Sequence, residues 1–309
     1  MTDAVRTAGR IGPHVESHEP RLLATKFIKM TLGASAVPLS GYIVTDVTHD
    51  IINWGMDDND RLGCCGFAAV DHGNVAKLGD ATQAGWSFFP QFKSLAAAYF
   101  AYGLAQGEVG PPDHPDQPDQ GVSNALMLGW LYKMGEIDGY AEVPLDQLDW
   151  FVDQFKGVIT GLVINDNTAQ HDFEVGAAWD TMMNRNAGHD VLTVKTNADG
   201  SGEMVTWGAL QKFTVGFRNN NITDAWVIFD KDDPYVDWDA LEAVLTEIHG
   251  VVNPIQPIPD PTPAASSRHE SIAHRLHSIL GRALSRETED VIVGELQTLV
   301  QRLTGNRRL

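Results

Sequence analysis

Two adjacent cysteines, Cys64 and Cys65, occupy a position at which a thiol could act as a nucleophile. They follow Gly63 at the point where a polar turn gives way to an apolar segment with helical spacing. A thiol at a helix start meets backbone N–H groups that lack intrahelical partners, together with the positive end of the helix dipole. This setting favours the thiolate, which is the nucleophilic form of cysteine. The alternative is that both side chains are small buried hydrophobes, which is common for free cysteines.

A nucleophilic cysteine needs a general base, usually histidine, and donors that stabilise the oxyanion. His189 is the best placed of the eleven histidines, because it precedes an apolar run, DVLTVK, that predicts a strand. The adjacent Asp190 should then point to the opposite face of that strand. His72 shares the predicted helix of Cys65 but lies two turns further on, which gives it a poor reach. A purely structural role for His189 is the alternative, since a single histidine before a strand is more often structural.

Metal and disulfide chemistry are poorly supported. Two cysteines are too few for a four-cysteine zinc site, and adjacent cysteines cannot form a disulfide framework. A bridge between Cys64 and Cys65 would be strained. Residues 110–121, GPPDHPDQPDQG, have the composition of an irregular exposed loop, and the alternative is a metal site formed by Asp113, His114 and Asp116. We expect no metal and no cofactor.

The charge of the chain restricts its partners. Its 309 residues include 22 Lys and Arg against 41 Asp and Glu, for a net charge of −19. Residues 253–309 hold seven Arg and six acidic residues, so residues 1–252 carry 15 basic and 35 acidic side chains, a net of −20. Nucleic-acid binding needs clustered Lys and Arg, so we expect no nucleic acid as a partner. Such an acidic body would suit a cationic partner surface.

No targeting or membrane segment is evident. The first 20 residues have no apolar stretch typical of a secretory signal. No run in the chain approaches the roughly 18 apolar residues that a membrane helix needs. We therefore expect synthesis in the cytoplasm without export through a signal peptide, and no membrane insertion.

The elements that must position these side chains fall into two groups. Helical spacing predicts the first group, and β-branched and aromatic runs predict the second. Helices first and strands second indicate an α+β fold with an antiparallel sheet. The expected helices are 21–32, 65–78, 92–104, 122–134, 145–155 and 238–249, and the expected strands are 157–164, 190–195, 203–207, 213–217 and 225–229.

Four local patterns in this order resemble papain-like cysteine peptidases over residues 50–230. Asn59 stands six residues before Cys65, where that family has a glutamine. The Gly63-Cys64-Cys65 turn before a small-residue helix is similar to the family's G-S-C-W element. The other two patterns are GVSNALMLGWLYKMGEI (121–137), which resembles the substrate strip and its helix, and the pair GHDVLTV (188–194) and VTWG (205–208), which resembles the histidine strand and the N-S-W-G element.

This likeness is closest to a little-characterised group of papain-like proteins in bacteriophage and bacterial genomes. His189 follows Cys65 by 124 residues, close to the roughly 130–150 typical of the family. The resemblance implies a helical half that carries Cys65 and an antiparallel half that carries His189. It also implies Cys65 as nucleophile, His189 as base and then acid, and Asn59 with the Cys65 N–H as oxyanion donors.

The same resemblance implies that Gly121 and Trp207 line the substrate site. Two departures matter. The family's histidine-orienting Asn is replaced by Val205, which cannot hydrogen-bond the ring, although Glu203 on the same strand face could substitute. The Trp that follows the nucleophile in the family is Gly66 here, which should leave a more open subsite.

The chain divides by composition into four parts. Residues 1–40 form an N-terminal extension, and residues 41–252 form the papain-like domain. Residues 253–267 hold five prolines, which is typical of a stiff linker. Residues 268–309 carry two apolar stripes, which predict a tail of two helices that pack on each other, on the body or on another protein.

Two functions from different classes remain. The first is a mainly structural, oligomeric, virion-associated protein of a bacteriophage, a capsid or tail component on a cysteine-peptidase fold, with protein partners bound through the C-terminal helices. It would be made in the host cytoplasm. The alternative is an active thiol hydrolase, a peptidase or amidase that cleaves a peptide substrate with a Cys65–His189 dyad. A cell-wall amidase is a form of the second that fits poorly with so acidic a body.

Overall fold

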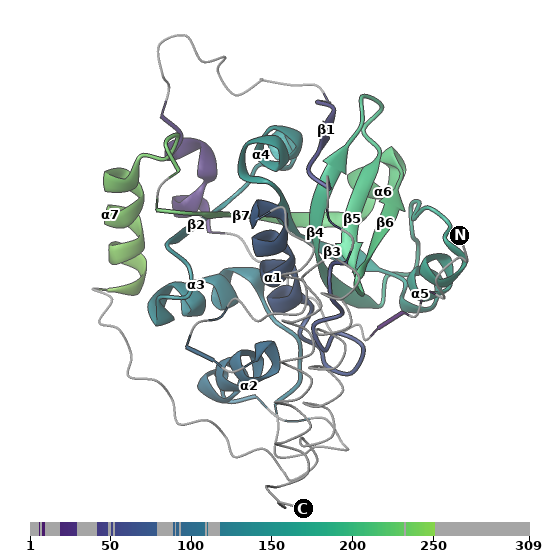
Figure 1. The fold of residues 1–309 in the computed structure, drawn as a ribbon, viewed down its shortest axis with the longest axis horizontal. Coiled ribbons are helices and arrows are strands. Elements are labelled where there is room, and N and C mark those ends of the chain that lie inside the picture. The colour runs from purple at the N-terminus through teal and green to yellow at the C-terminus, as the bar shows by residue number, and fades with distance from the viewer. Residues whose placement is uncertain are drawn as a thin grey trace, which may run out of the picture. The chain divides into compact units, whose positions relative to one another are not determined.

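The computed structural model describes residues 19–29, 42–48, 53–78, 94–108, 118–231 and 233–250, with single positions at 6, 8, 9, 51, 89, 91, 92 and 110 (Figure 1). The chain divides into two units, residues 1–259 and 260–309, and every described residue belongs to the first. The predicted C-terminal helices, the three residues of the alternative metal site and the whole of the predicted linker lie outside the described residues.

The described residues form an antiparallel sheet of seven strands. Six strands follow the order β2-β7-β3-β4-β5-β6, and β1 pairs with β4 outside this path. Neighbouring strands are antiparallel throughout. The bounds are β1 Thr45–Asp46, β2 Gly139–Glu142, β3 Val158–Ile164, β4 Ala187–Thr196, β5 Gly202–Thr206, β6 Ala209–Phe213 and β7 Ile222–Phe229.

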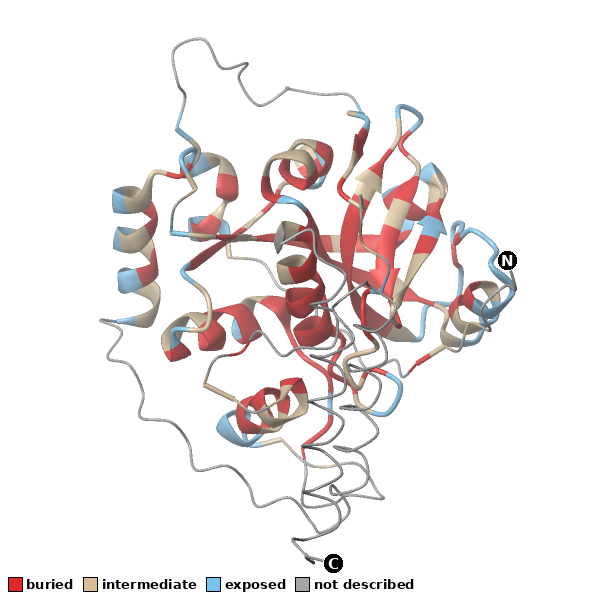
Figure 2. Cartoon of the chain, in the orientation of Figure 1, coloured by how far each residue is buried: buried red, intermediate tan, exposed pale blue. Residues whose placement is uncertain are grey.

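Helices cover this sheet, and α1 matters most for the site because it lies against β4 (Figure 1). Most residues of α1 and of the middle of the sheet are buried (Figure 2). The helices are α1 Cys65–Leu78, α2 Leu95–Gln106, α3 Asn124–Met134, α4 Leu148–Phe155, α5 Asp166–Val175, α6 Val215–Asn221 and α7 Trp238–His249, with 3-10 turns at Pro20–Leu22, Ala24–Lys26 and Leu145–Gln147.

Aromatic packing holds the helices near the start of α1. The ring centroid of Phe67 on α1 lies within 6.2 Å of the ring centroids of four neighbours, which are Phe89, Tyr99, Tyr102 and Trp130. Two of these lie on α2 and one lies on α3, so one buried side chain ties three helices together. Such rings remove large apolar areas from water and prefer tilted or edge-on contacts. The first turn of α1 is thereby held firmly against the rest of the domain.

The predicted α+β class with an antiparallel sheet is confirmed. Helix 65–78 begins and ends as predicted, and the helices expected near 92–104, 122–134, 145–155 and 238–249 are present with small shifts. The third of these, the helix expected over 145–155, begins as a 3-10 turn before α4. The strands expected near 157–164, 190–195, 203–207 and 225–229 are present as β3, β4, β5 and β7.

Two predicted elements are wrong. The run 213–217 is not a strand, because β6 ends at Phe213 and Thr214 caps α6 by accepting a hydrogen bond from the Phe217 N–H at 3.1 Å. The expected helix over 21–32 is replaced, up to residue 29, by two 3-10 turns, the first of which begins at Pro20. Strands β2 and β6 and helix α5 were not predicted.

None of the helices in the described part of the chain is long and apolar enough to cross a membrane.

Candidate functional site

Cys65 is the first residue of α1, and its side chain is buried, with 4% of its surface exposed. The turn before it is held by one carboxylate. Asp119 Oδ1 accepts hydrogen bonds from the Gly63 N–H at 2.7 Å and from the Tyr99 hydroxyl at 2.9 Å. The same hydroxyl accepts the Gly121 N–H at 3.1 Å. The predicted cysteine turn and the predicted substrate glycine are therefore joined through Tyr99 and Asp119.

The partner of the Cys65 thiol is a carboxyl group. Cys65 Sγ lies 3.6 Å from Asp190 Oδ2 and donates to it, while the Asp190 N–H donates to the sulfur at 3.4 Å. Asp190 is itself buried on β4. This double contact fixes the thiol against the strand, and it places the carboxyl group of Asp190 beside the thiol, where the sequence had predicted the imidazole of His189.

A second carboxyl group and one amide complete the cluster. Asn124, at the start of α3, donates its side-chain N–H groups to Asp190 Oδ1 at 2.8 Å and to Asp224 Oδ1 at 3.3 Å. Gly161 on β3 lies directly opposite Asp190 on β4 and Asp224 on β7. Directly opposed residues share a face of the sheet. The absent side chain at Gly161 leaves that face open for Asn124 to bridge the two acids.

Burial and like charge set the protonation of this cluster. Burial raises the pKa of the Cys65 thiol well above its ordinary value, and the neighbouring Asp190 raises it further. Burial, with the charge of Asp224, also raises the pKa of Asp190 to about 8, although the Asn124 amide opposes this shift. At neutral pH both groups are protonated. The thiolate that a helix N-terminus favours is therefore disfavoured here, because desolvation outweighs the helix dipole.

His189 faces a different set of side chains. Its Nε2 lies 2.6 Å from the Thr206 hydroxyl, and its ring stacks on Trp207 with centroids 5.0 Å apart and planes 25° from parallel. Neighbouring residues of a strand point to opposite faces. His189 and Asp190 accordingly have different partners, and Asp190 occupies the face that meets α1.

The hairpin after β5 positions Trp207. Trp207 and Gly208 have φ angles of 46° and 71°, both in the left-handed region. Two such residues in succession form the turn that suits a tight hairpin, although a tryptophan at such a φ is unusual. The buried Trp207 ring also meets Phe173 of α5 edge-on, at 4.9 Å between centroids. His189 is thus held between a hydroxyl group and an aromatic ring.

Two predicted residues lie apart from these contacts. Glu203 is opposite Lys195 in the sheet, three residues along β5 from Thr206. Val205 is buried opposite Leu192. The oxygen that meets His189 thus belongs to Thr206, which directly follows Val205 and comes three residues after Glu203.

Asn59 is buried in the turn before α1, and its N–H donates to the Met56 carbonyl at 3.0 Å. His72, the other histidine of interest, lies 3.1 Å from the Asp57 carboxylate through Nε2. Burial, the largest single cause, would lower the pKa of His72, but the contact and charge of Asp57, the Gly55 carbonyl and the charge of Asp71 together outweigh burial, so the pKa is raised. His72 therefore stabilises the loop before Cys65 and is not a partner of the thiol.

Sequence reasoning missed Asn124, Thr206 and Asp224. Asp224 had a visible signal, since it is an acid inside the apolar run 222–229. Asn124 follows Gly121 and opens a predicted helix, where a polar residue is ordinarily explained as part of the helix start. Its role depends on which strands lie opposite, so no local pattern could identify it.

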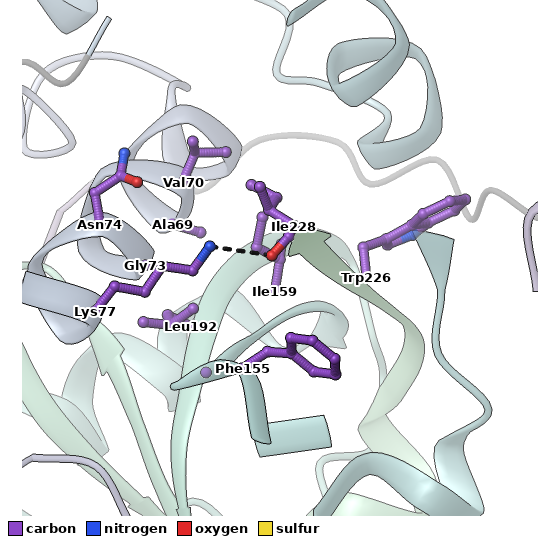
Figure 3. A pocket seen from close by; sticks show the side chains of 11 residues that line it. Ala69, Val70, Gly73, Asn74, Lys77, Phe155, Ile159, Leu192, Trp226 and Ile228 are labelled. Carbon is purple, nitrogen blue, oxygen red and sulfur yellow. Dashed lines mark hydrogen bonds between the residues drawn. The ribbon is translucent and has the colours of Figure 1, made fainter. Parts of the chain in front are cut away.

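No group of three or more His, Cys, Asp or Glu side chains in the described part of the chain is arranged to hold a metal ion. A shallow pocket lies between α1 and the sheet, toward the C-terminal half of the helix (Figure 3). Its charged side chain, Lys77, donates to the Ile228 carbonyl at 3.1 Å and pairs with Asp230 at 2.8 Å. Cys65 does not line this pocket.

We compared the chain with models of protein families, with curated proteins and with solved structures. None of the three comparisons found a match. Its function is therefore argued from its own residues.

Proposed function

We propose that this chain is a structural protein on a papain-like fold, and that Cys65 and Asp190 form a buried structural contact. One observation carries the proposal: the Cys65 thiol donates to the Asp190 carboxyl at 3.6 Å, on the face of β4 that meets α1. A general base must reach the proton that it abstracts. Here the group within reach is an acid that is itself protonated at neutral pH.

An assembly role is supported by the rest of the chain. The body is strongly acidic, and the two apolar stripes of residues 268–309 need a surface to cover them. We propose that these stripes bind further copies or another protein of a particle. A virion-associated component of a bacteriophage, made in the host cytoplasm, combines these properties with the resemblance to papain-like proteins of phage genomes.

Thiol reactivity tests the first part of this proposal. We expect iodoacetamide to leave Cys65 unlabelled in the folded protein below about pH 8, where an ordinary cysteine begins to react. Peptide mass mapping of Cys65 is the measurement, and the same protein in denaturant is the control for labelling efficiency. Rapid labelling near neutral pH that is lost in His189→Ala would overturn the proposal in favour of an active enzyme.

Deletion of residues 253–309 tests the second part. The shortened chain should lose its oligomers larger than a dimer, measured by light scattering, or its incorporation into particles, measured by co-purification. A shortened chain that still assembles would remove the role proposed for the tail.

The alternative, a thiol hydrolase, is favoured by one specific observation. His189 is oriented by the Thr206 hydroxyl and by stacking on Trp207, and a base held by a third group is the usual arrangement in nucleophilic catalysis. For His189 to reach Cys65, β4 would have to shift by one residue, which exchanges the two faces of a strand. Labelling that depends on His189 would be the sign of such a shift.

A further inference from the structure

Three described residues near the N-terminus, Arg6, Ala8 and Gly9, lie near the far end of the sheet. The Arg6 guanidinium donates to the Leu210 carbonyl at 2.5 Å and, at 3.3 Å each, to Gln211 Oε1 and the Phe173 carbonyl. It also lies over the Phe173 ring, with 5.0 Å from Cζ to the centroid. This short piece lies beside α5 (Figure 1). Arg6 therefore recognises a specific arrangement of two carbonyls, an amide and a ring.

Gly9 enters a narrow space between two predicted site residues. A Cβ atom on Gly9 would lie 2.2 Å from the Asn59 carbonyl oxygen and 2.3 Å from Cδ1 of the Trp207 ring. Both separations are far too short for a real contact, and one involves backbone that cannot rotate away. The space between Asn59 and Trp207 thus accepts a glycine and excludes every larger residue. We refer to residues 6–9 as the arm, and to the site that holds Arg6 and Gly9, which extends from Phe173 to Asn59, as the arm groove.

The arm groove retains unused binding capacity. Asn59 Oδ1 and Trp207 Nε1 are buried, and neither has a hydrogen-bond partner among the described residues. Buried polar atoms without partners are destabilising and uncommon. One is an acceptor and the other a donor, and both residues flank Gly9, so a main-chain segment seated slightly differently could satisfy them.

We propose that the arm groove also binds the arm of a second copy of this chain, so that two copies exchange residues 6–9. The contacts made by Arg6 and Gly9 can form whichever copy supplies the arm, and exchange of an identical element is a low-cost route to a dimer. The arm is joined to the domain at Glu19, whose N–H donates to Glu142 Oε2 at 2.9 Å. Nine residues separate Gly9 from Glu19, which is a reach of up to about 30 Å when extended.

Arm exchange is independent of the thiol and of the C-terminal tail, so its failure and the failure of the proposed function are distinguishable. Its recognition rule is also specific. The incoming segment must offer an arginine and, three residues later, a glycine.

The first experiment uses the full chain with Gly9→Ala, whose own arm cannot dock. A fluorescent peptide of residues 3–12, DAVRTAGRIG, is the probe, and anisotropy is the measurement. We expect Gly9→Ala to bind the peptide at least roughly tenfold more tightly than the unmodified chain, because a tethered arm competes at millimolar effective concentration. Gly73→Ala is the matched control, since its Cβ would meet only Leu192 at an ordinary 3.7 Å. Peptides carrying Ala for Arg6 or for Gly9 should lose binding.

The second experiment tests the source of the arm. The unmodified chain and Gly9→Ala are refolded at high protein concentration, and their masses are compared by light scattering. The unmodified chain and Gly73→Ala should both contain an additional dimer that Gly9→Ala lacks. Equal dimer fractions in all three proteins would overturn arm exchange, and equal binding of the three peptides would overturn the arm groove itself.

Discussion

The two faces of β4 contain two polar sites that differ in almost every physical property. On the face toward α1, Cys65, Asp190, Asn124 and Asp224 form a buried cluster of hydrogen bonds. On the other face, His189 is held by Thr206 and by stacking on Trp207. The residues that define them, Asp190 and His189, are adjacent in sequence.

The difference shows that strand register decides which chemistry meets the thiol. A shift of one residue exchanges the faces of a strand. With Asp190 toward α1, the thiol meets a protonated acid, and the pKa of the thiol is raised. With His189 toward α1, the same sequence would present a base. When two neighbouring residues of a buried strand are both polar, either side chain could face the helix. The packing of the strand decides which of the two does so.

The largest expected effect concerns pH and the α1 face. Because the pKa of Asp190 is raised from 3.8 to about 8 in the folded protein, the folded state holds a proton that the unfolded state releases. The contribution of Asp190 to stability is therefore fully present below about pH 4 and is lost as pH rises toward 8, by about 1.4 kcal/mol for each pH unit within that window.

Asp190→Asn removes this dependence while keeping the shape of the side chain. The variant should gain stability relative to the unmodified chain as pH rises from 4 to 8, measured by urea denaturation at several pH values. A constant difference across that range would show that Asp190 is ionised in the folded protein. Asp199→Asn is the control, because Asp199 is an exposed acid of the turn after β4.

The next effect concerns the packing of the opposite face. Trp207→Ala should destabilise the protein by about 3–5 kcal/mol, because it deletes a buried ring that supports both His189 and Phe173. Thermal and chemical denaturation measure the change. A loss below 1 kcal/mol, as is usual at surface positions, would mean that the ring is not packed in this way. Trp207→Phe should recover part of the stability.

A smaller effect is expected at the amide that joins the two acids. Asn124→Ala should destabilise by about 1–3 kcal/mol, since it leaves two buried carboxyl groups without their common donor. It should also raise the pKa of Asp190, because the Asn124 hydrogen bond lowers it. Carbon-13 NMR of the carboxyl groups measures this shift, and an unchanged pKa would contradict the bridge.

The smallest effect separates the two faces most directly. Thr206→Val removes the hydroxyl that meets His189 and keeps the size of the side chain, so it should destabilise by about 1 kcal/mol. Reactivity of Cys65 toward iodoacetamide should not change, because the hydroxyl and the thiol lie on opposite faces. A changed reactivity would connect His189 to Cys65 and favour the hydrolase.

Local patterns were sufficient for most of the fold. The apolar spacing after Gly63 predicted α1 to the residue, and β-branched runs predicted β3, β4, β5 and β7. The run 213–217 was mistaken for a strand because its β-branched and aromatic composition concealed Thr214, whose hydroxyl caps a helix. Strand β2 was missed because its four residues, GYAE, carry no periodic signal before they pair with β7.

For the candidate site, the residues of the chain by themselves determined where reactive side chains occur and which strand carries the histidine. Only the tertiary structure decided which of two adjacent side chains meets the thiol, because that choice depends on how β4 packs against α1. It also decided the chemistry, since burial and the nearby Asp224 raise the pKa of Asp190. The residues that bury and charge this cluster lie 34 to 159 positions apart in the chain, and no local pattern encodes their proximity.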